Sequence, residues 1–260
     1  MSLEFDLSLL AIGLAIAIRF GVLTATLPFL DSRAVPPLWR VALAGCFAAA
    51  LTPAVAAKMG PGALALSWQM IVAECVRSLT IGVLLGFAVN LVFAAVKMAG
   101  EVAGMQVGFA IVNAFDPMTN SQVSVLSQMY YLLAVLLFFA TGGHHVLVEA
   151  MFQSCLVIPP FSSLDPAGGS WYLVNAFGGV FSLGLRIAAP VVLVLLLVSA
   201  AMGVIVKTVP QMNILAVGFP IQIAVGLLVL GLSLVFFKTI VLDLFAGLPD
   251  RLDVVLLALQ

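Results

Sequence analysis

Few residues in this chain have side chains that could carry out catalysis or hold a metal ion. The two histidines, His144 and His145, are adjacent, so on a helix they point about 100° apart and cannot chelate one ion together. His145 and Glu149 are four residues apart and could share a helix face, but two ligands without a third are weak evidence for a metal site. We therefore expect no metal, no cofactor and no catalytic residue.

The cysteines do not indicate chemistry either. Cys46, Cys75 and Cys155 are widely spaced among apolar residues, which fits neither a disulfide framework nor a metal knuckle. An intramembrane enzyme would need a nucleophile with a base, or a metal triad, and the sequence has no G-x-S-x-G motif and no Cys/His constellation. The sequence thus predicts a protein that is not an enzyme.

The composition places the chain in a membrane class. Of its 260 residues, 64% are hydrophobic and only 8% are charged, and the mean hydropathy is +1.27. A soluble fold of this size needs far more charge to cover its surface. The net charge of −1 argues against nucleic-acid binding, and the acidic start of the chain argues against a cleaved signal peptide. We expect an integral membrane protein or a component buried inside an apolar assembly.

Long uncharged runs predict helices that approach the length needed to cross a bilayer. The runs cover residues 7–30 around Arg19, 41–57, 78–96, 123–141, 172–206 around Arg186, and 214–237. Breaks are expected at Pro53 and at residues 218–220, and Pro190 either kinks its helix or sets its first turn. Gly142-Gly143 are expected to stop or loosen the helix before them, and loops are expected at 159–170 and 208–213. The predicted fold is all-α, with membrane-type helical hairpins and broken helices. It forms one domain over 1–260, divided into N-terminal helices 1–96, a central region 97–122, a middle helix and loop 123–170, and a C-terminal hairpin and tail 171–260.

Three charges in apolar surroundings need an explanation. An arginine in the middle of a membrane costs about 3 kcal/mol, so Arg19 needs a partner, a wet cavity or a position near the membrane interface. Glu74 and Arg77 are three residues apart and can neutralise each other on one helix face. The few loop Lys and Arg residues do not settle the topology.

The central region 97–122 interrupts the apolar pattern with polar residues and regularly spaced glycines. Gly100, Gly104 and Gly108 lie four residues apart, which places them on one face of a helix where another backbone can approach closely. A similar face contains Gly82 and Gly86. After Gly108 an apolar stretch leads to Asp116-Pro117, which disfavours helix. Two interpretations remain open, an ordinary connection between buried helices or a constriction that acts as a plug.

Residues 99–117, AGEVAGMQVGFAIVNAFDP, and 208–226, TVPQMNILAVGFPIQIAVG, resemble the FliR/SctT family. These are export-gate proteins of the flagellar type III secretion apparatus and of injectisomes, and the similarity extends over essentially the whole chain. The central loop looks like the flagellar form, with an SctT-type subunit as the nearest alternative. A secondary transporter remains a lesser one, suggested by the broken helices.

The resemblance implies a non-enzymatic subunit that joins FliP and FliQ in a helical assembly partly above the inner bacterial membrane, in the flagellar basal body. Unfolded flagellar substrates, including rod and hook-basal proteins, would cross through it, with FlhB, FlhA and membrane lipid as further partners and no nucleic acid. The implied pore plug or gate comprises Gly108, Phe109, Ile111, Val112, Phe115, Asp116 and Pro117. The implied subunit-packing residues are Gly82, Gly86, Gly100, Gly104, Glu101 and Gln106, and the hairpin tip contains Pro210, Gln211 and Asn213.

Overall fold

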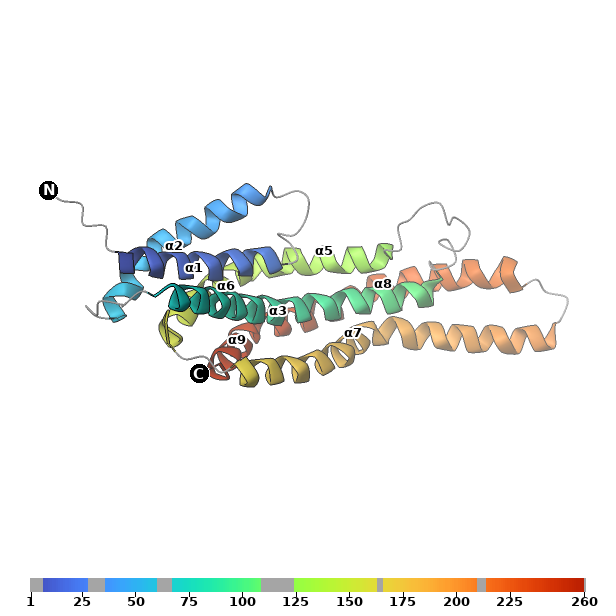
Figure 1. Cartoon of the computed structure of the whole chain (residues 1–260). Coiled ribbons are helices and arrows are strands. Elements are labelled where there is room, and N and C mark those ends of the chain that lie inside the picture. The colour runs from blue at the N-terminus through green and yellow to red at the C-terminus, as the bar shows by residue number, and fades with distance from the viewer. Residues whose placement is uncertain are drawn as a thin grey trace. The chain divides into compact units, whose positions relative to one another are not determined.

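The computed structural model describes residues 7–27, 36–59, 67–108, 124–162, 166–209 and 214–259, and all regular structure within these ranges is α-helical. The all-α prediction is therefore confirmed. The helices, labelled in Figure 1, are α1 (Leu7–Thr26), α2 (Pro37–Met59), α3 (Trp68–Val107), α5 (Val125–Ala140), α6 (Gly143–Val157), α7 (Pro166–Thr208), α8 (Ile214–Ala246) and α9 (Leu248–Leu257).

Five stretches of helix are long and apolar enough to cross a membrane. They lie in α1, α2, α3, α7 and the run from α8 into α9, and a sixth span results if the bent pair α5 and α6 counts as one. The membrane-type architecture follows from these lengths, because a single span needs about 20 apolar residues.

Several predicted interruptions are not helix ends. Pro53 lies inside α2 and Pro220 inside α8, so the breaks expected at Pro53 and at residues 218–220 are wrong. Pro190 lies inside α7, which excludes the first-turn alternative for this residue. The loop expected over 159–170 also ends early, because α7 already begins at Pro166. In a strongly apolar segment the helix forms more backbone hydrogen bonds than any other structure. This gain outweighs the one hydrogen bond that each proline removes.

Gly142 produces the break that the sequence did predict. Its φ of +74° is left-handed, a conformation that glycine adopts without a steric penalty, and it separates the end of α5 from the start of α6. The N–H groups of His145 and Val146 then donate to the Gly142 carbonyl as α6 begins.

Contacts group the chain into two compact units, and each unit combines segments that are far apart in the sequence. The first unit contains Met1–Leu91, Gly142–Phe177 and Gly247–Gln260, and the second contains Val92–Thr141 and Gly178–Ala246. These boundaries cut through α3 and α7. A single export domain over 1–260 stays a prediction.

The core of the first unit forms where α1, α2, α6 and α9 pack. α1 lies against α2, with Phe20 stacked on Phe47 at a ring-centroid distance of 5.0 Å, and α6 contacts α9 (Figure 1). Ile16 and Met151 are completely buried in this unit. Apolar burial of this kind is the main favourable contribution to its folding.

Aromatic rings form the core of the second unit. Phe93 of α3, Phe138 of α5 and Phe245 of α8 lie within 5.3–5.8 Å of one another between centroids. Tyr130 packs on Phe237 at 4.6 Å. Tilted and edge-on pairs such as these add to the energy of burial, and here they join α3, α5 and α8.

Candidate functional site

The residues predicted to form the plug lie mostly outside the described part of the chain. Phe109, Ile111, Val112, Phe115, Asp116 and Pro117 are among them, and so are the hairpin-tip residues Pro210, Gln211 and Asn213. Gly108, the first predicted gate residue, is described. The candidate site is therefore built from the residues that flank segment 109–123.

Gly108 ends α3 at the point where the sequence pattern changes. Its φ is +99°, and its N–H donates to the Met105 carbonyl at 3.2 Å. A side chain at this φ would be strained, whereas glycine is not. α3 runs without interruption from Trp68 to Val107, so the predicted close-packing helix before the loop is confirmed.

The glycine face at the end of α3 receives the start of α5. A Cβ atom added to Gly100 would lie only 2.5 Å from Ser127 Cα, and one added to Gly104 would collide with Ser124 Oγ. The Ser127 hydroxyl donates to the Lys97 carbonyl at 2.9 Å. The missing side chains therefore let α5 dock on α3 immediately after segment 109–123, as small-residue faces do between membrane helices.

α8 holds the other flank of the same segment. Val107 is completely buried, and a Cβ atom added to Gly226 would lie 2.9 Å from its Cγ2. The Gln222 side-chain amide donates to the Gln106 carbonyl, and the Phe219 ring is close to Gly108. Both flanks of segment 109–123 are thus held within the α3, α5 and α8 cluster of the second unit.

The other predicted packing glycines also have neighbours within the chain. A Cβ atom added to Gly82 would lie 2.9 Å from both the Arg19 carbonyl oxygen and Val22 Cβ, and Gly86 faces the Thr26 side chain. Asn90 supports the same contact by donating to the Thr26 carbonyl. The two glycine faces thus seat α1 and α5 on α3, and their contact with another subunit stays a prediction. Glu101 is exposed and Gln106 is half-buried.

A buried cluster of charges lies in the first unit. Arg19 has no solvent exposure, and its Nη2 is 3.6 Å from Glu74 Oε1. The Arg77 guanidinium donates to Glu74 Oε2 at 3.0 Å, and the Ser78 hydroxyl donates to Glu74 Oε1 at 3.0 Å. The expected Glu74–Arg77 pair is therefore confirmed, and Glu74 is also the partner that Arg19 needed.

The same cluster fixes the chain after α6. Arg19 Nη1 donates to the Ser154 and Ile158 carbonyls at 3.0 and 2.9 Å. Both acceptors lie at the end of α6, and the Ser154 carbonyl also accepts a hydrogen bond from the Ile158 N–H. The Phe161 N–H donates to Glu74 Oε2 at 2.7 Å, and Phe161 has a left-handed φ of +67°. A cation at a helix C-terminus is favourable, so α1, α3 and α6 meet at one electrostatically matched point.

Sequence reasoning missed part of this site. The spacing of Glu74 and Arg77 predicted that they pair. Nothing in the sequence links Arg19 to a residue in another helix. Arg186, which interrupts the predicted apolar run 172–206, is exposed within the chain. Gln222 gave no signal, because an isolated glutamine in an apolar run has no distinctive spacing.

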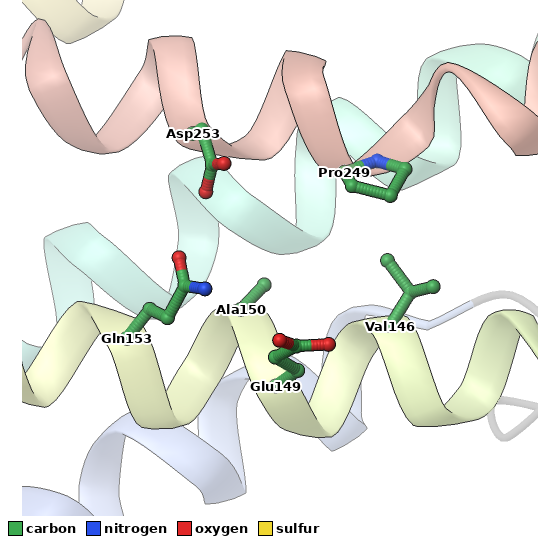
Figure 2. Close-up of a pocket in the computed structure, with 6 residues that line it drawn as sticks. All are labelled: Val146, Glu149, Ala150, Gln153, Pro249 and Asp253. Carbon is green, nitrogen blue, oxygen red and sulfur yellow. The ribbon is translucent and has the colours of Figure 1, made fainter.

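Pockets lie beside α6 in the first unit, and the two histidines line one of them. A pocket of about 170 Å³ lies between α6 and α9 and is lined by Glu149 and Gln153 of α6 and by Asp253 and Pro249 of α9 (Figure 2). His144 and His145 line a neighbouring apolar pocket with Phe47, Leu51 and Phe152. Within the described residues, no group of three or more His, Cys, Asp or Glu side chains could hold a metal ion.

The fold and its buried polar cluster define an all-helical protein of the membrane type. The sequence model of the family described as Bacterial export proteins, family 1, matches residues 10–248 of the chain. The chain is 30% identical over 228 residues to the flagellar biosynthetic protein FliR of Bacillus subtilis, and 86% of each chain is covered. It is 30% identical over 244 residues to FliR of Pectobacterium carotovorum, covering 94% of this chain and 92% of the relative. For FliR of Escherichia coli the identity is 31% over 217 residues, covering 81% and 79%.

This chain belongs to the FliR family of bacterial flagellar export proteins. The predicted resemblance is therefore confirmed. The family consists of transport components and is not a known enzyme family.

Proposed function

We propose that the chain is a core subunit of the flagellar type III export gate, assembled with FliP and FliQ in the inner membrane. Unfolded flagellar substrates pass through this assembly, with FlhB and FlhA as neighbouring components. The flagellar name of the relatives favours this assignment over an injectisome subunit.

The length of α7 is the observation that supports an assembly. α7 has 43 residues, which corresponds to about 65 Å at the usual helical rise, whereas the hydrocarbon core of a bilayer is about 30 Å thick. Only 11% of the apolar segment Gly168–Thr208 is buried within the chain, and Phe181, Leu197 and Val204 are at least 64% exposed. Lipid covers about half of such a helix, so helices of other subunits are needed for the rest.

The segment 109–123 acts as the plug of the closed gate in this proposal. Phe109, Ile111, Val112 and Phe115 supply an apolar ring, and a narrow apolar constriction blocks ions by excluding water. Gly108 and the Asp116-Pro117 step bound the piece that an arriving substrate displaces. Support comes from the flanks, because the docking of α5 on Gly100 and Gly104 and of α8 on Val107 gives the segment fixed points of attachment.

Deletion of residues 110–116 tests the plug. We expect cells that carry the deletion to become permeable to ions and small molecules while some export persists. A second variant, in which the same seven residues are replaced by glycine and serine, keeps the chain length and isolates the contribution of the apolar side chains. Both variants should raise conductance, and conductance at the intact level in both would overturn the plug.

Co-expression tests the assembly. The chain produced with FliP and FliQ should be recovered with both as one particle in native mass spectrometry. Recovery of the chain alone, in the presence of both partners, would contradict the proposal. Glu101, exposed on the turn before Gly104, would take a pairing or hydrogen-bonding role at a subunit contact.

A further inference from the structure

The last turn of α3 receives a hydrogen bond from another helix. The final four carbonyl groups of an α-helix have no partner within that helix and must be satisfied by other groups. Gln106 is in the last turn of α3, and its carbonyl accepts a hydrogen bond from Nε2 of Gln222 in α8. The Gln222 carboxamide is therefore a C-terminal cap for α3 that is supplied by α8.

Gln222 is the polar member of a three-residue face that seats the end of α3. Phe219, Gln222 and Gly226 are spaced i, i+3 and i+7, which places them on one side of α8. Phe219 lies beside Gly108, and Gly226 makes room for Val107. The apolar contacts bring the two helices together, and the hydrogen bond fixes the orientation of the last turn.

We propose that Gln222 is a positioning residue of the gate, holding the end of α3 and so the point from which segment 109–123 begins. This inference rests on the proposed plug function. Gln222 does not touch a reacting group or a substrate in this proposal. Its effect passes through the Gln106 carbonyl, the left-handed turn at Gly108 and the attachment of the plug.

The chemistry of the contact gives a matched set of variants. Gln222→Leu keeps a similar volume and removes the donor, so the Gln106 carbonyl loses its partner. Gln222→Lys retains an N–H donor on a longer side chain and can restore the bond. Thr239→Val is the control, because the Thr239 hydroxyl donates only within α8, to the Val235 carbonyl at 3.1 Å, and is exposed.

The experiment uses the complete chain in its complex with FliP and FliQ and has two readouts. Amide hydrogen exchange over residues 99–108 should become about fivefold faster in Gln222→Leu, the factor that corresponds to loss of one hydrogen bond. Basal ion conductance of the closed complex should rise by a similar factor. Gln222→Lys should recover most of both values, and Thr239→Val should change neither.

The two readouts separate this inference from the plug itself. If the 110–116 deletion conducts ions but Gln222→Leu changes neither exchange nor conductance, the role of Gln222 is overturned and the plug stands. Faster exchange with unchanged conductance also overturns the role of Gln222 in the gate. If the deletion does not conduct, the plug falls, and the exchange rates alone decide whether Gln222 positions the end of α3.

Discussion

Arg19 is a charged residue whose side chain is completely buried, although arginine side chains normally contact water. A buried guanidinium loses several kcal/mol of hydration, which its partners must offset. Arg19 has an ion pair with Glu74 and two carbonyl acceptors at the end of α6, while Nε and Nη2 have no hydrogen-bond partner among the described residues. The cluster thus stabilises the first unit only as long as its one carboxylate is present.

Replacement of Glu74 should therefore be much more harmful than replacement of Arg77. We expect Glu74→Ala to lower the free energy of unfolding by about 3–5 kcal/mol, because it leaves Arg19 as an unpaired buried charge. The control is Arg77→Gln. The Arg77 side chain is 22% exposed, and we expect a loss of about 1 kcal/mol or less.

Unfolding of the full chain in detergent, followed by tryptophan fluorescence, measures both variants. Equal losses for Glu74→Ala and Arg77→Gln would mean that Arg19 is not held by Glu74.

Local spacing explains what could be predicted at this scale. Glu74 and Arg77 are three residues apart on one helix, so their pairing follows from helical geometry alone. Arg19 reaches Glu74 and Ser154 only through the packing of three helices, which no sequence interval encodes. The need for a partner was predictable, and the identity of that partner was not.

At the scale of elements, α3 organises both units through its two glycine faces. Gly82 and Gly86 receive α1 in the first unit, and Gly100 and Gly104 receive α5 in the second. The four-residue spacing predicted that something would approach closely. It did not identify the approaching helix, because a small-residue face fits a helix of the same chain as well as a helix of a partner.

A pair of glycine-to-alanine variants separates packing from helix propensity. Gly100→Ala brings a methyl group against the Ser127 backbone, and overpacking of this kind costs about 1–3 kcal/mol. Gly203→Ala in α7 has nothing within 4 Å of the new methyl group, so it should instead stabilise the helix by up to about 1 kcal/mol.

Thermal unfolding of the two variants should therefore shift in opposite directions from the parent chain. A shift of the same sign in both would show that Gly100 is not in close contact with α5.

Prolines illustrate why element boundaries were harder to predict than element type. The sequence correctly indicated helices throughout, because uncharged runs of this length favour no other structure in lipid. It placed breaks at Pro53 and at residues 218–220, although each proline removes only one backbone hydrogen bond from a helix that has many. The break at Gly142 was predictable because a left-handed residue redirects the chain itself.

On the scale of the whole molecule, apolar exposure is the dominant feature. Composition predicted the membrane class, since a charged content of 8% cannot cover a soluble protein. The two-unit organisation could not be predicted, because it depends on contacts between segments far apart in the sequence. α7 illustrates both the apolar composition and the two-unit organisation, since it is apolar along its length and contributes residues to both units.

A charge on the exposed face of α7 should separate the chain from its proposed partners FliP and FliQ. Leu197 is 71% exposed, and we expect Leu197→Asp to reduce recovery of FliP and FliQ with the chain at least tenfold, because an aspartate buried against apolar helices costs over 1.4 kcal/mol. Affinity purification followed by quantitative mass spectrometry measures this recovery.

Leu197→Ala, which removes apolar area without adding charge, is the control and should reduce recovery only slightly. The amount of each variant in the membrane fraction is measured in parallel. Normal recovery of both partners with membrane-inserted Leu197→Asp would indicate that this part of α7 faces lipid.

The interleaved construction of the first unit also has a consequence for biogenesis. Leu259, which is completely buried, meets Gly169 at the start of α7, and α9 packs on α6. During translation, α6 and the start of α7 therefore emerge well before the segment that packs against them. A ribosome must finish α9 before this unit can close, so a nascent chain that stalls earlier leaves an apolar surface open to chaperones and proteases.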